Sequence, residues 1–508
     1  MKPADPLAQA ALPDSRGINL FHADPAYAGL LQHYLEPKLY AHLLPHFERL
    51  GALAGDELDR LAATADRNPP VLHHRARSGE DRQWIEKHPA YRRLEEIAFG
   101  EYGLAAMSHR GGVLGWPAPL PPIAKYALTY LYVQAEFGAC CPLSMTDALT
   151  RTIRKFGDPA LVARYLPGLT QQDLDALTQG AMFMTEQGAG SDVGATATRA
   201  VREGDAWRLY GDKWFCSNAD AGLALVLARP DGAPAGTKGL SLFLLPKMLP
   251  EGAPNHYRIV RLKDKLGTRD MPSGEIRLEG AVAHLVGDPQ RGFVQMADMI
   301  NMSRLSNGMR AAGMMRRALT EALFVARRRV AFGKRLIELP LMRRQLLKLM
   351  LPTECARSVM LYSAVQLAKA DTGDETARRR VRLLTPLLKF RACRDARLLR
   401  DAHLGSIWEG TSNIVALDVL RAIRKDKALE AMEFDLGKAA AFARTADETH
   451  ARQAATGLYY ACAAAILERE GRTLPRRALL ARLVRRHRLG PRDPLQPVDD
   501  AFAEPLLQ

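Results

Sequence analysis

The chain has 508 residues, of which 47% are apolar, so it is long enough to form at least two packed cores. Its net charge of +15 favours polyanionic ligands, either nucleic acid or small substrates with several phosphates. No stretch resembles a membrane span or a signal peptide, so we expect a cytoplasmic protein without a membrane partner. The six cysteines lack a C-x-x-C spacing, which argues against a zinc site or a disulfide framework, and no metal is expected.

Four segments follow one another along the chain. Residues 1–179 are predicted to form an N-terminal α-helical domain, because apolar residues recur at spacings of three and four. Residues 180–287 contain short runs such as "AWRLYG" and "LSLFLLP" between Gly, Asp and Pro, which predicts a middle antiparallel, barrel-like β domain. Residues 288–425 return to the helical period and suit a helix bundle, and residues 426–508 form a basic helical extension. The fold class is therefore α+β multidomain, with a cleft expected between β domain and bundle.

The stretch "MFMTEQGAGSDVGATATRA" opens the β segment. Gly188, Ala189 and Gly190 are small enough to let backbone N–H groups approach an anion or a flat ring, and Thr185 and Ser191 add hydroxyl groups. This loop is neither a Walker-A loop nor a G-x-G-x-x-G turn. Taken alone, G-A-G is more typical of an ordinary glycine loop that opens a β-sheet.

Further motifs follow in the order "GDKWFCSNAD", "KDKLGTRDMPSGEIRLEGA", "RRRVAFGKRL" and "RLLRDAHLGSIWEGTSNI". With the first loop they resemble the acyl-CoA dehydrogenase family of flavoproteins, which has T-E-x-G-x-G-S-D, K-L-G-x-R, R-x-x-F-G-K and E-G-T in this order. "KWFCS" and "ELPLMRR" are similar to the AidB-type branch, associated with the adaptive response to DNA alkylation. The resemblance implies the acyl-CoA dehydrogenase-like fold, FAD as cofactor, α,β-dehydrogenation of an acyl-CoA thioester, an electron acceptor that stays unknown, and a homodimer or homotetramer.

Glu409 matches the catalytic base of the E-G-T motif. Removal of the proton beside a thioester needs a carboxylate, and burial would raise its pKa toward a useful value. The other interpretation is a structural acid near the start of a helix over residues 411–425, with Thr411 as N-cap. Some family members place the base on the first long helix after the β domain, where this chain has Ser303, so no second base is expected.

The resemblance also implies binding residues. Those for the flavin are Met182, Met184, Thr185, Gly190, Ser191, Phe215, Cys216, Ser217, Arg329, Thr411 and Asn413. Arg329 is assigned to the pyrophosphate because guanidinium binds phosphate in a bidentate manner, although Arg327 and Arg328 beside it indicate that part of this run is only solvated. Those for the acyl-CoA are Ser191, Arg304 and Gly410.

Two departures from the family pattern stand out. A common aspartate three residues before Arg304 is Asn301 here, which affects recognition of the coenzyme A end. A helix and a G-G-x-G-Y loop are absent between Ala396 and Arg397, where in the family the loop helps to hold the flavin of a neighbouring subunit.

The basic C-terminal segment raises an alternative function. Residues 472–492 contain eight arginines and no acid, and Arg485, Arg486 and Arg488 are candidates for contacts with the phosphates of duplex DNA. A solvated helix face or a disordered basic tail would have the same composition. The alternative to the dehydrogenase is therefore an AidB-type flavoprotein that binds duplex DNA and has weak or no dehydrogenase activity.

Overall fold

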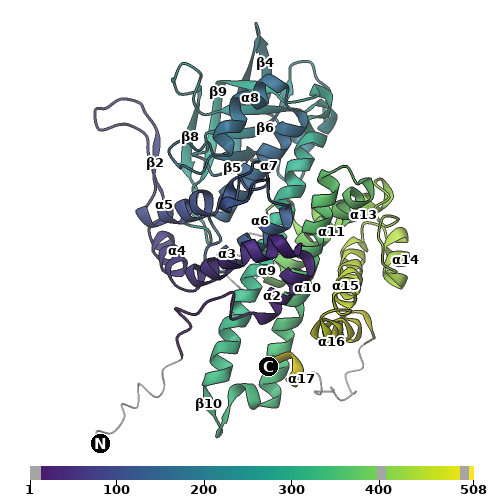
Figure 1. Cartoon of the computed structure of the whole chain (residues 1–508). Coiled ribbons are helices and arrows are strands. Elements are labelled where there is room, and N and C mark those ends of the chain that lie inside the picture. The colour runs from purple at the N-terminus through teal and green to yellow at the C-terminus, as the bar shows by residue number, and fades with distance from the viewer. Residues whose placement is uncertain (1–12, 397–407, 492–502, 508) are drawn as a thin grey trace, which may run out of the picture.

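The structure, a computed structural model, describes residues 13–396, 408–491 and 503–507. In Figure 1 the strands gather at one end of the molecule, and long helices run from them toward the opposite end. The N-terminal helices cover one side of these long helices, and the C-terminal helices cover another. This order of helices, strands and helices confirms the predicted α+β fold class.

The N-terminal part is helical, with one exception. Its helices are α2 (Pro25–Tyr34), α3 (Pro37–Gly55), α4 (Glu57–Arg67), α5 (Pro89–Glu95), α6 (Pro122–Tyr132), α7 (Cys140–Phe156) and α8 (Pro159–Leu169). Between α4 and α5 the chain forms an antiparallel hairpin of β1 (Val71–His73) and β2 (Trp84–Glu86), where the sequence predicted helix. Proline at both ends of this stretch prevents helix continuation, and His73 stacks on Trp84 with ring centroids 4.2 Å apart.

The β domain is a seven-stranded sheet. Its strands are β3 (Gly180–Phe183), β4 (Arg199–Glu203), β5 (Ala206–Ser217), β6 (Leu223–Pro230), β7 (Ser241–Pro246), β8 (Tyr257–Leu262) and β9 (Ser273–Leu285). Most pairs are antiparallel, as predicted, but β6 runs parallel to both β3 and β4. One face of the sheet has its own apolar core around Phe243 and Leu278, and β3 packs on α7.

The bundle consists of α9 (Gly292–Arg328), α10 (Pro340–Asp371) and α11 (Glu375–Ala396), which pack on each other, and α9 also packs on α7. Gly292 lets α9 start against β7, since an added Cβ would lie 2.4 Å from the backbone of Ser241 and Leu242. The remaining helices are α13 (Ser412–Arg424), α14 (Gly437–Thr445), α15 (Ala451–Glu470), α16 (Pro475–Val484) and α17 (Ala503–Leu507). None of the described helices is both long enough and apolar enough to cross a bilayer.

A buried ion network fixes the C-terminal extension to the bundle. Arg477 on α16 is 1% exposed and binds Glu470 on α15 at 2.8 Å and also Glu354 on α10. Glu354 in turn pairs with Arg357, which reaches Asp24 at the start of α2. Because removal of one partner leaves a buried charge uncompensated, the network ties α16 firmly to α10 and to the start of α2. At least one arginine of the basic segment is therefore a core residue.

Candidate active site

Glu409 lies at the entrance to α13, in a backbone conformation that is rare for a residue with a side chain. Its φ is +57°, in the left-handed region, and that of Gly410 is +99°. The carboxylate atom Oε2 is buried and has no hydrogen-bond partner among the described residues. Burial raises the pKa of Glu409, while the Ser303 hydroxyl and the cations of Arg304, Lys389 and Arg310 act in the opposite direction. The carboxylate is thus buried at the entrance to α13 and does not cap this helix, whose N-cap is Thr411.

Arg304 on α9 holds the backbone of Glu409 in place. Its Nε donates to the Glu409 carbonyl oxygen at 3.0 Å, and its Nη1 binds Asp418 at 2.6 Å. Asp418 is also bound by Arg382 at 2.7 Å, so helices α9, α11 and α13 meet at this carboxylate. Arg304 was predicted to contact the acyl-CoA. Its guanidinium is engaged within the chain, which makes it a positioning residue for Glu409 in this structure.

Lys389 on α11 supports the next residue, since its Nζ donates to the Gly410 carbonyl oxygen. The φ of Gly410 favours glycine, and an added Cβ would also lie in tight contact with Ile414, at 3.3 Å. The ammonium of Lys389 is 1% exposed, and burial lowers its pKa to about 8. Lys389 and Asp418 had not been predicted, because neither belongs to a motif of the family pattern.

Replacing Lys389 by methionine should change how stability depends on pH. A lysine whose pKa is lower in the folded state binds fewer protons there, so the wild-type free energy of unfolding gains from Lys389 as pH rises from about 8 toward the ordinary value of 10.5. The free energy of unfolding of the wild type, relative to that of Lys389→Met, should therefore increase by up to about 3 kcal/mol over this pH range. Urea unfolding at several pH values measures it. A difference that stays constant with pH would contradict a buried ammonium at this position.

The loop from Thr185 to Ser191 is anchored by a buried ion pair. Glu186 binds Lys213 on β5 at 2.8 Å and accepts from the Thr198 hydroxyl and from the backbone N–H groups of Ala197 and Thr198. Lys213 is 0% exposed, and its pKa is lowered by burial, while that of Glu186 is lowered by the lysine. Fixed in this way, the loop leaves Gly190 and Ser191 exposed, whereas Met182 and Met184 pack partly into the main core.

An exposed aromatic ring stands beside this loop. The backbone N–H of Trp214 donates to the Thr185 carbonyl oxygen at 2.7 Å, which joins β5 to the loop. At Phe215 the pairing of β5 with β9 is irregular, φ is +53°, and the side chain is 55% exposed. The Cys216 side chain points into the β core, so it can offer a ligand only its backbone, and Ser217 is half-buried. The strained Phe215 is the residue that presents a flat apolar face.

Thr411 occupies the N-cap of α13, but its hydroxyl makes no capping hydrogen bond. Both Thr411 and Asn413 are exposed, and the Asn413 amide oxygen lies 3.5 Å from a guanidinium nitrogen of Arg452 on α15. Arg329 is far from them, because it follows the last residue of α9, and α9 spans about 55 Å at 1.5 Å per residue. From Arg304 to Arg329 the helix rises about 37 Å. One chain therefore does not bring Arg329 to the other predicted flavin contacts.

Models of known protein families match the chain over most of its length. Profiles of the adaptive response protein AidB N-terminal domain, the acyl-CoA dehydrogenase middle domain and the acyl-CoA dehydrogenase C-terminal domain match residues 11–176, 181–281 and 290–397. Acyl-CoA dehydrogenase family member 11 of Caenorhabditis elegans is 31% identical over 79% of this chain and 70% of its own length. AidB of Escherichia coli strain K12 is 34% identical over 74% of this chain and 73% of its own length. The chain belongs to the acyl-CoA dehydrogenase family.

Solved structures agree with this membership. The apo form of Bd2924 has a TM-score of 0.83 at 32% identity and covers 91% of this chain and 99% of its own. Caenorhabditis elegans ACDH-11 in complex with C11-CoA has a TM-score of 0.82 at 26% identity and covers 93% of this chain and 91% of its own. As an acyl-CoA dehydrogenase family member of AidB type, the chain is an oxidoreductase of a flavoprotein family, as the sequence predicted. The segment around residues 397–401, next to the expected deletion, lies outside the described residues.

Proposed function

We propose that the protein catalyses FAD-dependent α,β-dehydrogenation of an acyl-CoA thioester, with Glu409 as the base that removes the α-proton. The observation that carries this proposal is the buried, unpartnered Oε2 of Glu409 in a backbone conformation held by Arg304. Burial away from water raises the pKa of a carboxyl group, which makes its carboxylate a stronger base. The complex of ACDH-11 with C11-CoA supports a CoA thioester as the ligand class.

The residues assigned to the flavin fit FAD in their chemistry. Phe215 exposes a ring at a strained position, and the Thr411 hydroxyl is free of its capping role. Thr185, Gly190 and Ser191 add hydroxyl groups and bare backbone on the anchored loop. These residues, with Ser217 and Asn413, would hold the cofactor, which supplies a hydride acceptor for the β-carbon when it is bound. Anaerobic titration of the FAD-loaded protein with acyl-CoA thioesters of increasing length tests the proposal, which predicts bleaching of the flavin.

Arg329 enters the proposal through a second copy of the chain. Since it lies about 37 Å along α9 from Arg304, it can reach the pyrophosphate only of a flavin bound by another subunit. This placement supports a homodimer or homotetramer. Phe332 lies in the short hairpin that follows α9, at the same end of this helix as Arg329. Its side chain is 93% exposed, which suits a contact between subunits.

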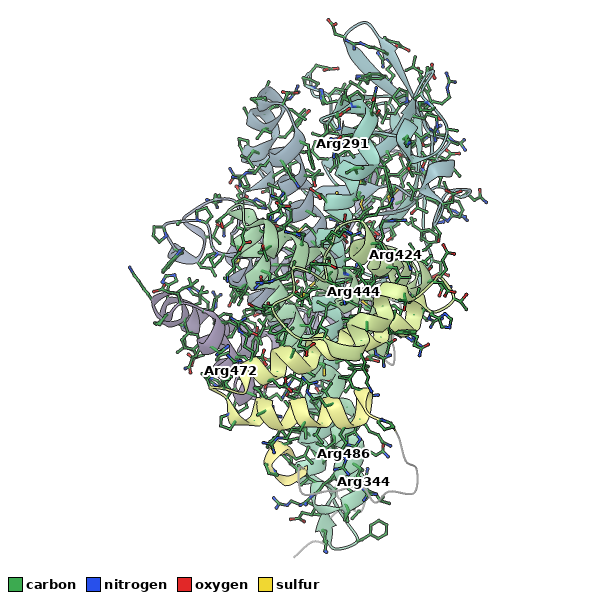
Figure 2. All side chains as sticks on the ribbon, turned by 90° about the vertical axis from the view of Figure 1, so that its right-hand side faces the viewer. Arg291, Arg344, Arg424, Arg444, Arg472 and Arg486 are labelled. Atoms are coloured by element: carbon green, nitrogen blue, oxygen red, sulfur yellow. The ribbon has the colours of Figure 1, made fainter. Side chains whose placement is uncertain are left out.

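Duplex DNA binding is the second candidate function. Exposed or half-exposed arginines lie along one side of the molecule, from the start of α9 over the C-terminal helices to the start of α10 (Figure 2). Those labelled there are Arg291, Arg424, Arg444, Arg472, Arg486 and Arg344. Such a row could neutralise several phosphates of a duplex. Of the three arginines first singled out, Arg485 pairs with Glu468 at 2.7 Å and Arg488 packs over Tyr460, so Arg486 is the best placed.

Replacing Arg472 and Arg486 together by alanine should weaken binding to duplex DNA equally for all sequences. If each contacts one phosphate, the slope of log K against log salt should fall by about 2. Fluorescence anisotropy of a labelled duplex across a salt series measures it. The matched control is Arg485→Ala, whose guanidinium is already paired with Glu468 and which should change the slope less. Unchanged binding in the double variant would remove the support for this face.

A further inference from the structure

A row of buried polar side chains leads along α9 away from Glu409. Ser303, Asn307 and Arg310 are four and three residues apart, which places them on one face of the helix. Their exposed fractions are 0%, 1% and 1%. In the described part of the chain, Ser303 Oγ, both amide atoms of Asn307 and all three guanidinium nitrogens of Arg310 lack a hydrogen-bond partner.

Arg310 lies in the same interior region as the carboxylate of Glu409. Its guanidinium is 5.2 Å from the centroid of the Phe137 ring and lies beside the Cys141 thiol, at the start of α7. Its charge is close enough to Glu409 to lower the pKa of that carboxyl. The row thus runs from the base, at the level of Ser303, to a cation enclosed by an aromatic ring and cysteines.

Such an arrangement is costly without an acceptor. Buried polar groups are nearly always hydrogen-bonded, and an unpaired buried charge is among the most destabilising features of a protein interior. Two acids, Glu136 and Asp270, lie near Cys140 as Arg310 does, and each has interactions of its own, but neither accepts a hydrogen bond from Arg310 in the described chain. The cation–π contact with Phe137 compensates only part of the cost. The N–H donors of Arg310 therefore have no hydrogen-bond acceptor among the described residues, and a carboxylate from a ligand would satisfy them.

We propose that the acyl group of the substrate carries a carboxylate at its far end, and that Arg310 and Asn307 bind this carboxylate. The substrate class is then the mono-thioester of coenzyme A with a dicarboxylic acid. A guanidinium matches a carboxylate in bidentate geometry, and the Asn307 amide adds a donor. This inference rests on the proposed dehydrogenase function and specifies its substrate.

The spacing along α9 limits the acyl chain. Ser303 and Arg310 are about 10 Å apart along the helix axis, and helical side chains tilt toward the N-terminus, which brings the guanidinium closer to Glu409. A short or medium chain fits this distance. The reaction itself is unchanged, because the α-carbon gives its proton to Glu409, the β-carbon gives a hydride to the bound flavin, and the distal carboxylate stays intact.

Binding to the FAD-loaded full-length protein tests the inference by calorimetry. Succinyl-, glutaryl-, adipyl- and suberyl-CoA are each compared with the monocarboxylic thioester of the same length, butyryl-, pentanoyl-, hexanoyl- and octanoyl-CoA. At the best length, the dicarboxylic thioester should bind about 10- to 100-fold more tightly than its partner. Equal or tighter binding of the monocarboxylic thioesters throughout the series would overturn the inference. Bleaching by those thioesters would still leave the role of Glu409 intact.

Two variants sharpen the test. Arg310→Met should abolish the preference for the dicarboxylic thioester, whereas Arg328→Met, which removes a charge from the exposed end of the same helix, should keep it. An equal loss in both variants would show a general charge effect and refute the specific site. Should Arg310→Met fail to fold, Asn307→Leu takes its place. The ratio of the affinities for the dicarboxylic and monocarboxylic thioesters should then be smaller in Asn307→Leu than in the wild type. Glu409→Gln should retain the preference but not bleach, which separates the binding site from the chemistry.

Discussion

Exchanging Glu409 for glutamine should slow flavin reduction by acyl-CoA by about 10²–10⁴-fold while FAD stays bound, because glutamine keeps the size of the side chain but cannot accept the α-proton. Anaerobic stopped-flow bleaching measures the rate, and the absorbance of the bound flavin reports cofactor retention. Since Ser303 occupies the other position from which family members supply a base, the chain has no carboxylate there to replace Glu409. The loss should therefore reach the upper part of the range.

The pH profile provides the control for this result. Because burial raises the pKa of Glu409, wild-type bleaching should increase as pH rises through that raised pKa, as the carboxyl loses its proton. Glu409→Gln should lack this dependence. If Glu409 were only an acid at the helix end, the exchange would cost about 0.3–1 kcal/mol of stability and leave bleaching unchanged. Wild-type protein that bleaches with no thioester would refute the dehydrogenase.

Glu186→Gln should lower the free energy of unfolding by about 3–5 kcal/mol, since it leaves the ammonium of Lys213 buried without its counter-charge. It should also weaken FAD binding, because the loop from Thr185 to Ser191 loses the contact that ties it to β5. Urea unfolding and titration of the apoprotein with FAD measure the two effects. The stability loss should shrink as pH rises, because Lys213 has a lowered pKa and sheds its proton.

A second ion pair on β5 provides the matched control. Asp212 binds Arg277 at 2.8 Å, but both side chains are exposed. Asp212→Asn should change stability by no more than about 0.5 kcal/mol and leave FAD binding unaltered, because solvent screens exposed pairs. Equal effects of the two substitutions would show that burial of the Glu186–Lys213 pair is not what stabilises the loop.

Local patterns in the sequence were sufficient to predict the fold class and to mark a candidate base. The change from helical spacing to short strand runs marked the β domain, because side-chain period and turn residues are local properties. The E-G-T motif marked Glu409, and the glycine after it is explained by the positive φ and close contacts of Gly410. The hairpin between α4 and α5 was missed, since three-residue strands carry too little periodicity to be recognised.

Charges were interpreted less well, because their role depends on partners distant in sequence. Arg304 is 105 positions from the Glu409 carbonyl oxygen it holds, and Arg477, in the basic segment, is a core residue bound to Glu354 and Glu470. Composition gives the number of arginines but not which are paired. Only tertiary contacts separate Arg477 from Arg486, which stays exposed.

The sequence by itself determined the family, the order of helices and strands, and the identity of the candidate base, since each is written in contiguous motifs or in a periodicity. Helical spacing places Ser303, Asn307 and Arg310 on one face of a helix, but a polar face in a sequence normally indicates contact with solvent, and this row was not predicted as a site. Only the packing of α7 and α11 against α9 encloses that face. Periodicity fixes which side chains share a face, whereas the burial of that face depends on which other elements of the chain pack against it.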